Sequence, residues 1–408
     1  MTAPIHDFIK HTIGGGWGAE TSGPDDQPVR IIRGADFPDV QLRDVSNLPL
    51  RYEPVSKISR RALRSGDIVL ETSGGTANRP TGRTVLITAG MVANATATLI
   101  PASFCRLVRI DETMYSPEFV YYALQCLYDD GGTWEYQNQS TGISNFQFEV
   151  FRKRYRLPSI DREDQNLIAE VLGALDDKIA VNTGLARKAD DLASARFSQE
   201  IRQVPKSSLT FSDLAKVSGG GTPSTKIPNY WGGNVEWATP TDITALSGPY
   251  LEATSRRISA EGLRACSSEL FQPGAILMTS RATIGAFAIA QVPTAVNQGF
   301  IVVEPHDVAL RYWLFHEMRS RVDEFVAYAN GATFLELSRG NFKSFLVRLA
   351  DLDVMAQFGR EAKALHSSAR AALRENAQLA ATRDALIPQL MSGKLRVKDA
   401  EKVLENVL

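Results

Sequence analysis

The stretch IGGGWGAE at residues 13–20 has a counterpart, VSGGGTPS at residues 217–224, about half the chain further on. A triple glycine suggests a phosphate-binding loop, but such a loop follows the pattern GxxxxGK[ST]. Neither stretch has that order, and the Gly-Lys pair at 393–394 is followed by leucine. The sequence therefore predicts two tight loops in which only glycine tolerates the backbone angles.

Five more short matches follow the glycines in the same order in both halves. Each match alone is weak, but their separation drifts slowly from 205 residues at Gly14 and Gly219 to 192 residues at the last pair. This order indicates a tandem duplication of a module of about 150 residues plus a tail, far longer than a solenoid repeat. The other matched pairs are Asp36 and Asp242, Gly66 and Gly274, Asn94 and Asn297, Phe146 and Phe342, and Gln165 and Gln357.

The first part of each module has the pattern of a mixed α/β domain. Short runs rich in β-formers follow a turn glycine at 66–73 and 274–280, and further strands are predicted at 84–88 and 287–292. Apolar residues at helical spacing predict helices at 116–130 and 310–329. We expect Asp36, Asp242, Asn94 and Asn297 to be structural loop or capping residues.

The tail of each module has a heptad pattern instead. From Asp161 to about residue 200 there is no proline, and Pro388 is predicted to end the second tail. Each seam carries one polar residue, Asn182 or Asn376. The first seam comprises Ile168, Leu172, Leu175, Ile179, Asn182, Ala186, Ala189 and Ala193. The second comprises Phe358, Ala362, Leu365, Ala369, Ala372, Asn376, Leu379, Arg383 and Leu386.

Two packing arrangements are open for these helices: each packs on its own domain, or the two pack on each other. The narrow seams favour a single partner helix. The predicted fold class is mixed α/β, with two tandem α/β domains joined by two long helices in an antiparallel coiled coil. A tail of 38 residues would form a rod of roughly 57 Å with a domain at each end. The predicted parts are domain 1 (1–157), helix 1 (158–204), domain 2 (205–350), and helix 2 with a C-terminal tail (351–408).

Composition sets limits on the function. The chain has 408 residues, is 44% hydrophobic and has a net charge of −1, which disfavours a nonspecific DNA-coating protein but permits local basic patches. It has no run of eighteen apolar residues and no signal-peptide core, so we expect no membrane contact and a cytoplasmic location. The three cysteines are expected to be buried, reduced thiols, and the five histidines lack metal-ligand spacing.

Several motifs together resemble the specificity subunit of type I restriction–modification enzymes. They span nearly the whole chain, and the order of two recognition domains alternating with two helices is that family's layout. The second half fits more closely than the first, in which GGGWG lacks the threonine-proline. The matching stretches are SGGGTPST, YWGG, EWATPTDI, LFQPGAILMTSRATIG, AVNQGF, LPSIDREDQNLIAEVLGALDDKI and LIPQLMSGKLRV.

The resemblance implies a noncatalytic subunit that binds double-stranded DNA. Each domain would read one half of a bipartite, asymmetric target, and the helices would set the gap of about 5–8 base pairs, given one turn per ~34 Å. Two methyltransferase subunits, which carry S-adenosylmethionine, would dock on the helices. A motor-nuclease subunit with ATP and Mg would join them, and this chain would hold no cofactor, no metal and no catalytic residue.

Candidate DNA contacts are basic residues that flank the same predicted strand in both modules. Arginine and lysine supply most phosphate contacts, and arginine also reads guanine. For any one of these residues, a solvated charged face is the alternative. The candidates in the first module are Lys57, Arg60, Arg61, Arg64, Arg79 and Arg83. Those in the second are Lys226, Arg256, Arg257, Arg264 and Arg281.

Two other classes of protein were weighed against this interpretation. A self-contained methyltransferase or nuclease would need an Asn/Asp-Pro-Pro-aromatic segment or a PD…ExK pattern, and the sequence has neither. A coiled-coil scaffold with ligand-binding domains and no DNA role stays open, because the net charge is close to zero. Salt-dependent binding to duplex DNA would distinguish the scaffold from the specificity subunit.

Overall fold

The computed structural model describes residues 3–76, 78–140, 143–331 and 335–400. The chain divides into two compact units: unit 1 comprises Met1–Val181 and Glu375–Leu408, and unit 2 comprises Asn182–Arg374. Two long helices, α6 (Arg162–Glu200) and α13 (Leu352–Met391), each contribute one half to unit 1 and the other half to unit 2. None of the helices in the described part of the chain combines the length and the apolar character that crossing a membrane requires.

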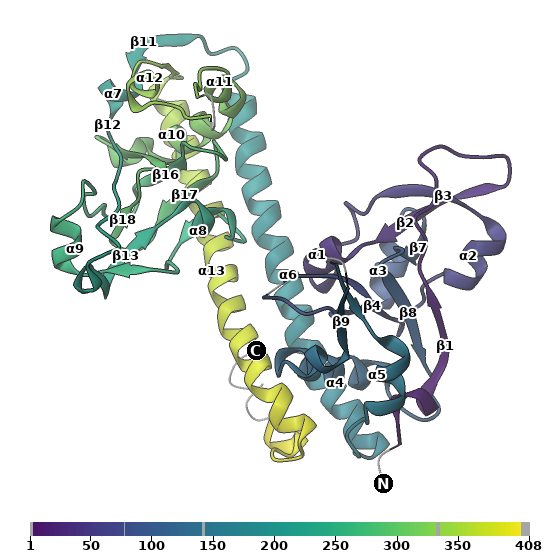
Figure 1. Ribbon diagram of the computed structural model, residues 1–408. Coiled ribbons are helices and arrows are strands. Elements are labelled where there is room, and N and C mark those ends of the chain that lie inside the picture. Colours follow the sequence, from purple (N-terminus) through teal and green to yellow (C-terminus); the bar gives the residue numbers. More distant parts are fainter. Residues whose placement is uncertain (1–2, 77, 141–142, 332–334, 401–408) are drawn as a thin grey trace. The chain divides into compact units, whose positions relative to one another are not determined.

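Within its described residues, unit 1 contains three small sheets and five short α-helices (Figure 1). The central sheet has the order β1 (Ile9–Gly14), β8 (Cys105–Ile110), β4 (Ile68–Glu71) and β6 (Thr84–Leu86), all antiparallel. The second has the order β3 (Leu50–Pro54), β2 (Asp26–Ile32) and β7 (Thr98–Pro101), and the third β5 (Ser73–Gly75), β10 (Ile143–Phe146) and β9 (Gln137–Ser140). The helices are α1 (Phe37–Gln41), α2 (Val55–Arg61), α3 (Ala89–Asn94), α4 (Pro117–Asp129) and α5 (Phe148–Arg154).

Unit 2 repeats the first two sheets of unit 1. Its central sheet has the order β12 (Ala215–Ser218), β19 (Phe300–Pro305), β16 (Ile276–Thr279), β17 (Phe287–Ala290) and β14 (Tyr250–Leu251). The next has the order β15 (Arg257–Ile258), β13 (Trp231–Ala238) and β18 (Thr294–Val296), and a short pair joins β11 (Lys206–Thr210) to β20 (Leu346–Arg348). The short helices are α7 (Phe211–Leu214), α8 (Pro240–Thr244), α9 (Ala260–Arg264), α10 (Arg311–Arg319), α11 (Val322–Ala327) and α12 (Arg339–Lys343).

The triple glycines mark the same place in both units, but for a different reason from the predicted one. None of the six has a positive φ, so the backbone angles do not require glycine. The requirement is close approach: a Cβ on Gly15 would collide with the carbonyl oxygen of Ala102, and one on Gly220 with that of Val296. The next amide in each loop then donates to a strand end, Gly16 to Pro101 and Gly221 to Val296, both at 3.0 Å. These loops hold the end of one strand against another and have no phosphate-loop pattern.

Strand pairing confirms the duplication and the first three sequence matches. Ile32 pairs with Pro101 in β2 and β7, as Ala238 pairs with Val296 in β13 and β18. Asp36 and Asp242 lie just after these strands and accept backbone N–H groups of Arg33 (2.8 Å) and Thr239 (2.7 Å). Both turn glycines lie in the left-handed region, Gly66 at φ +84° and Gly274 at φ +99°.

The last three matches are wrong. Asn94 ends a helix, whereas Asn297 follows β18. The backbone N–H of Asn297 donates to the carbonyl oxygen of Ala238, as the N–H of Ala102 donates to that of Ile32, so Ala102 is the counterpart of Asn297. The backbone N–H of Phe146 donates to the carbonyl oxygen of Thr72, and the N–H of Leu337 makes the equivalent bond to Ser280 in unit 2. The counterpart of Phe146 is therefore Leu337 and not Phe342. The long helices begin at Arg162 and Leu352, an offset of 190, so Gln357 corresponds to residue 167 and not to Gln165. Short polar matches in loops do not fix register, whereas strand pairing does.

The predicted helix at 310–329 is two helices, α10 and α11, interrupted around Arg321. The Arg321 side chain is 4% exposed and forms ion pairs with Glu317 (3.1 Å) on one side and Glu324 (2.7 Å) on the other. Glu317 is fully buried and also pairs with Arg348 (2.8 Å). The break therefore coincides with a buried charged cluster. A second correction concerns Pro388, which lies inside the last turn of α13 rather than ending it.

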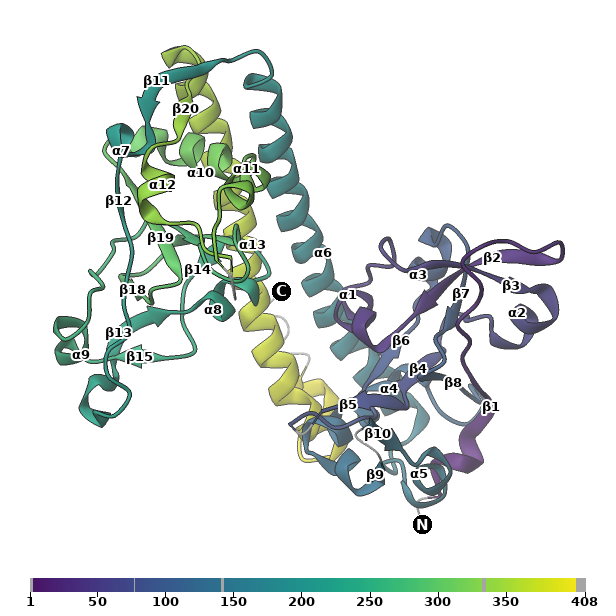
Figure 2. The ribbon, with the colours of Figure 1, turned by 45° about the horizontal axis from the view of Figure 1, so that its top comes forward.

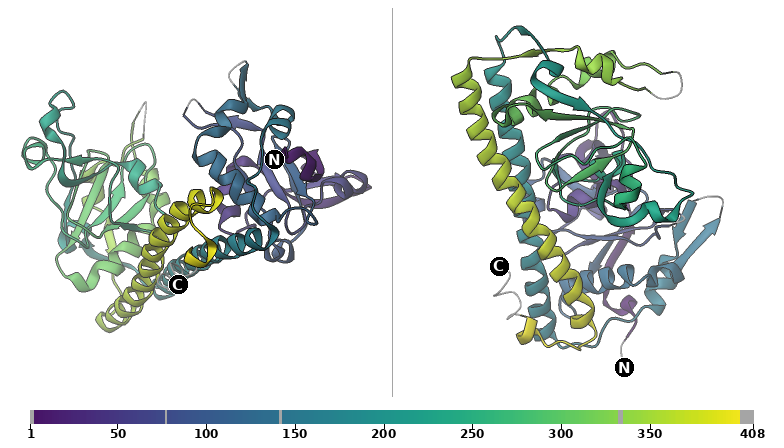
Figure 3. Two further views of the ribbon diagram at one scale, coloured as in Figure 1. Left: turned by 90° about the horizontal axis from the view of Figure 1, so that it is seen from below. Right: turned by 90° about the vertical axis from the view of Figure 1, so that its left-hand side faces the viewer.

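The two long helices are antiparallel and lie side by side (Figure 3). Within unit 1, Asp176 pairs with Arg383 at 2.7 Å, and Asn376 donates to the carbonyl oxygen of Ile179 at 3.1 Å. Within unit 2, Arg196 pairs with Glu361 at 3.2 Å. Close approach in unit 2 comes from Ala186, Ala189 and Ala369, which are all buried in one cluster.

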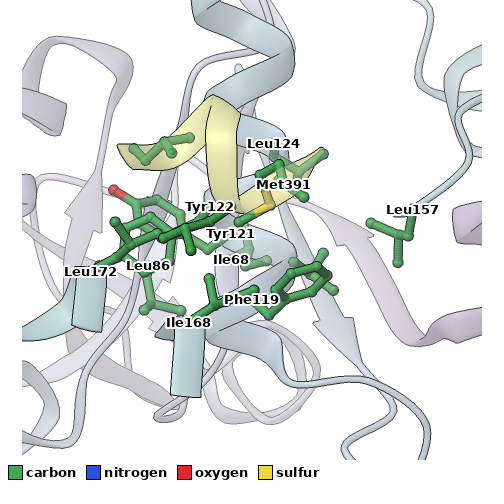
Figure 4. Close-up of a cluster of buried hydrophobic side chains, with 14 of the residues drawn as sticks. Ile68, Leu86, Phe119, Tyr121, Tyr122, Leu124, Leu157, Ile168, Leu172 and Met391 are labelled. Atoms are coloured by element: carbon green, nitrogen blue, oxygen red, sulfur yellow. The ribbon is translucent and has the colours of Figure 1, made fainter. Parts of the chain in front are cut away.

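The seam residues pack on the other long helix and also on a domain, so both predicted packing arrangements occur together. Ile168, Leu172 and Leu175 share one core with Leu379 of α13 and with the aromatic residues of α4 (Figure 4). Met391, at the end of α13, joins the same core. Of the predicted seam, these residues are buried: Ile168, Leu172, Leu175, Ile179, Asn182, Ala186, Ala189, Ala193, Phe358, Ala362, Ala369, Ala372, Leu379 and Leu386. Leu365 and Asn376 are half-buried.

A buried polar chain joins α13 to the sheet domain within unit 2. The Nε2 atoms of His316 in α10 and His366 in α13 are 3.0 Å apart, and His366 Nδ1 lies 2.7 Å from the Tyr250 hydroxyl. Tyr312 stacks on His366, and Phe197 stacks on His316. Burial lowers the pKa of His316 to about 2 and that of His366 to about 4, so both rings are neutral at pH 7.

Candidate nucleic-acid interface

The basic candidates before β4 in unit 1 gather on and beside α2. Lys57 and Arg60 are exposed on this helix, and Arg64 is exposed in the loop that follows it. Arg61 is half-buried and pairs with Glu53 at 3.1 Å. Lys57 and Arg61 together line a hollow of about 440 Å³ beside Trp17, a side chain that is 49% exposed. The structure therefore brings two of the four candidates together with an exposed aromatic ring.

The candidates after β4, Arg79 and Arg83, form ion pairs with the buried carboxylate of Glu71. Arg83 donates to both oxygens of that carboxylate, at 2.8 Å and 2.6 Å, and to the carbonyl oxygen of Gly34 at 2.7 Å. Arg79 lies 3.9 Å from Glu71 and donates to Gly74. Burial by itself lowers the pKa of Arg83, but the hydrogen bonds that Arg83 donates to Glu71 and the negative charge of that carboxylate raise the pKa overall. Arg83 thus has a structural partner, and Arg79 is the more accessible of the two.

In unit 2 the candidates are spread over several elements and loops. Arg256 lies over the ring of Trp231, with its guanidinium carbon 3.7 Å from the ring centroid, in cation–π contact. Arg257 pairs with Glu236 at 2.7 Å, and its side chain is 53% exposed. Lys226 and Arg264 are exposed in the loop after the glycines and at the end of α9.

Arg281 lies in a groove of about 500 Å³ at the end of β16. Its Nε atom lies 2.8 Å from Glu336 Oε1, and both side chains are more than two-fifths exposed. Near this groove, Phe211 of α7 stacks on Phe342 of α12 at 4.5 Å, and the two helices lie side by side in Figures 1 and 2.

The groove residues that the sequence reasoning missed include Gln298, Arg339 and Lys343. All three are exposed, and Arg339 extends over Gly219 of the glycine loop. Gln298 follows the AVN motif directly, so that motif could have pointed to it. Arg339 and Lys343 lie far along the chain, and only the fold brings them to the glycine loop.

The described residues contain no group of three or more His, Cys, Asp or Glu side chains that could hold a metal ion. The three cysteines have free thiols: Cys105 is buried, and Cys126 and Cys266 are half-buried. Burial raises the pKa of Cys105 to about 12, so its thiol is protonated at neutral pH. The arrangement is that of two similar binding scaffolds with differing side chains.

Comparison with known proteins assigns this architecture to a class. Residues 206–357 match the family model described as "Type I restriction modification DNA specificity domain". The chain is 36% identical over 148 residues to the type I restriction enzyme MjaIX specificity subunit of Methanocaldococcus jannaschii, covering 35% of this chain and 34% of that protein. It is 22% identical over 250 residues to the EcoR124I/EcoR124II specificity subunit of Escherichia coli, covering 58% of this chain and 60% of that protein.

The fold agrees over nearly the full length. The crystal structure of an S subunit of a type I restriction-modification system from M. genitalium matches with a TM-score of 0.58 at 13% identity, covering 96% of this chain and 95% of that one. The fold and the motifs thus define a class of two-module proteins that carry a DNA specificity domain. Residues 206–357 match the type I restriction modification DNA specificity domain, and the chain is similar to the specificity (S) subunits of type I restriction–modification systems. The matched stretches span about a third of the first relative above and 60% of the second.

Proposed function

We propose that this chain is the noncatalytic subunit that selects the DNA sequence for a type I restriction–modification complex. The observation that carries the proposal is the pair of equivalent scaffolds, each with its own set of polar side chains at matching positions. Two similar scaffolds that present different side chains suit a target with two different halves. The target is therefore double-stranded DNA with a bipartite, asymmetric sequence.

In this proposal residues 1–157 and 205–350 are the two target-recognition domains. Segments 158–204 and 351–408 contain the spacer helices and the C-terminal tail. The helices fix the distance between the half-sites and dock two methyltransferase subunits, and motor-nuclease subunits join for cleavage. S-adenosylmethionine belongs to the methyltransferase subunits, and ATP and Mg belong to the motor-nuclease. This division of labour gives the chain a cytoplasmic place of action.

Mapping methylated adenines in a host without other methylation tests the proposal directly. The chain is expressed together with the methyltransferase subunit of its own system, and we expect a single bipartite motif with a fixed gap. A matched control expresses the methyltransferase subunit alone and should give no motif. Methylation without sequence dependence, or a complex that binds DNA without salt dependence, would instead support a scaffold with no role in reading DNA.

A further inference from the structure

The groove at the end of β16 has a matching position in unit 1 that carries different chemistry. The amide of Ser280 donates to Gly299, as the amide of Thr72 donates to Phe104, both at 2.8 Å. Arg281 and Glu336 pair as neighbouring extended segments, as do Ser73 and Asn145 of β5 and β10. The pair Arg281–Glu336 is therefore the structural counterpart of the pair Ser73–Asn145.

The side chains at these matched positions contact each other in both units. Ser73 donates to Asn145 Oδ1 at 2.6 Å, and Arg281 Nε lies 2.8 Å from Glu336 Oε1. Neutral hydroxyl and amide groups in unit 1 thus replace a charged pair in unit 2. The two positions pair through the backbone in both units, so the difference between the units lies in what each pair of side chains can hydrogen-bond.

The ion pair with Glu336 fixes the position of the Arg281 guanidinium in the groove. The shortest contact of the pair joins Arg281 Nε to Glu336 Oε1, and within the described residues Glu336 is the carboxylate that pairs with Arg281. The two Nη groups lie beyond Nε, at the tip of the guanidinium. Those groups form the fork that matches two acceptors, such as O6 and N7 of guanine in the major groove. The Arg281 side chain is 44% exposed, so its fork is accessible from solvent.

The carboxylate also favours a base over a phosphate as the partner of Arg281. A phosphate near Arg281 would meet the negative charge of Glu336, whereas a base edge offers acceptors without net charge. Arg339 and Lys343 line the same groove without a carboxylate partner among the described residues, and they suit phosphate. Gln298 accepts from Thr222 through Oε1 at 2.7 Å, which leaves its NH₂ group as a donor.

The backbone next to Arg281 is held in an uncommon conformation. Ala282 has φ +59°, in the left-handed region, which residues other than glycine rarely adopt. Its amide donates to Leu335 at 3.2 Å, beside Glu336. This conformation fixes the chain that presents Arg281 against the chain that presents Glu336, and strain of this kind clusters at binding sites.

We propose that Arg281 reads a guanine in the half-site of the second domain, with Glu336 as its positioning residue. Ser73 and Asn145 occupy the corresponding reading position of the first domain, where their neutral groups select a different base. The inference rests on the proposed function and assigns particular positions to it.

The test uses the full chain assembled with its methyltransferase subunits. Binding is measured on duplexes that carry the methylome-derived target and every single base-pair change in each half-site, at several salt concentrations. For Arg281→Ala we expect a loss of discrimination of roughly 10- to 100-fold at one guanine of one half-site, with the salt slope unchanged. Glu336→Gln should reduce discrimination at the same guanine, and Ser73→Ala should act on the other half-site only.

Arg202→Ala, an exposed cation outside the groove, is the matched control and should leave every position unchanged. Thermal unfolding of each variant verifies that the fold is intact. A uniform loss across all duplexes with a salt slope shallower by about 1 would make Arg281 a phosphate contact and overturn the proposal. Unchanged discrimination in Arg281→Ala would overturn it as well. Failure of the unmodified complex to discriminate among duplexes would reject the proposed function itself.

Discussion

Asp176 of α6 and Arg383 of α13 form an ion pair of 2.7 Å that joins the two long helices inside unit 1. The Asp176 side chain is 9% exposed and also accepts from the Tyr122 hydroxyl at 2.8 Å. One carboxylate therefore links both helices to α4, which lies in the core of the unit. Burial by itself lowers the pKa of Arg383, but the negative charges of Asp176 and Asp384 and the hydrogen bonds that Arg383 donates to them raise the pKa overall, so the guanidinium stays charged at neutral pH.

Asp176→Asn should destabilise unit 1 by about 1–3 kcal/mol, because the Arg383 charge loses a largely buried partner. The measurement is the free energy of unfolding in urea. Asp177→Asn is the matched control, since Asp177 is 67% exposed and pairs with Arg43 at 3.1 Å near the surface. That change should cost less than about 1 kcal/mol. Equal effects of the two changes would contradict a structural role for the Asp176 pair.

The triple glycine allows a comparison between neighbouring residues. Gly15→Ala should strongly destabilise the first module, because its Cβ would collide with the backbone of Ala102 and neither strand end can move freely. Gly14→Ala should be tolerated, since a Cβ there meets no atom within 4 Å. Thermal unfolding of the two variants provides the measurement. Comparable stability of both variants would show that glycine at 15 is not required by close approach.

Acid should destabilise unit 2 through His316 and His366. Their folded-state pKa values, about 2 and about 4, lie below the ordinary value of 6.5 because both rings are buried. His366 and Arg319 lower the pKa of His316 further, whereas Asp190 raises and Arg319 lowers that of His366. A group of this kind contributes full stability above pH 6.5 and loses it as the pH falls towards the folded pKa, because the unfolded chain takes up the proton.

Between pH 6.5 and pH 5 each of the two histidines should therefore cost about 2 kcal/mol of unfolding free energy. His316→Gln should flatten this dependence, and the exposed His306→Ala should leave it unchanged. Urea unfolding of the three proteins at pH 7.5, 6.5, 5.5 and 5.0 measures the effect. The same slope in the His316 variant and the unmodified protein would count against a neutral buried pair.

The sequence predicted the duplication, the fold class and both long helices, because hydrophobic period and turn glycines are local signals. Gly66 and Gly274 were found since a left-handed turn demands glycine, and the seam of α6 was found from its heptad spacing. The later matches failed for a physical reason. Between Asp242 and Leu352 the two modules differ in loop lengths, and strand pairing rather than short motifs sets which residues correspond.

The groove could be predicted only in part. Arg281 follows a predicted strand, so its basic character near a strand end was visible. Its partner Glu336 lies 55 residues further on and reaches it through an isolated strand bridge, which no local pattern predicts. The sequence also did not predict that the long helices pack both on each other and on the domains. A heptad pattern indicates which residues are buried, but not whether a helix or a domain core covers them.

The duplication leads to a last prediction, about a fragment that ends at Val204. In unit 1, residues 375–391 of α13 pack on the first half of α6, and Leu379 is fully buried in that core. The fragment lacks this segment, so its apolar face would be exposed to water. At the offset of 190 residues, the second half of α6 corresponds to the missing segment, with Ala189 in place of Leu379. Two fragments should therefore pair antiparallel about a two-fold axis, each supplying Ala189 to the other.

Because alanine is smaller than leucine, this dimer should contain two cavities, and each Leu-to-Ala difference in a core costs about 2–5 kcal/mol. Ala189→Leu in the fragment should fill them and lower the dissociation constant, as measured by sedimentation equilibrium. Leu192→Ala, at a side chain that is 50% exposed, is the control and should change little. With methyltransferase subunits bound, the dimer should methylate a palindromic target made of the first half-site and its inverted repeat. A fragment that remains monomeric at micromolar concentration, with or without Ala189→Leu, would contradict the argument.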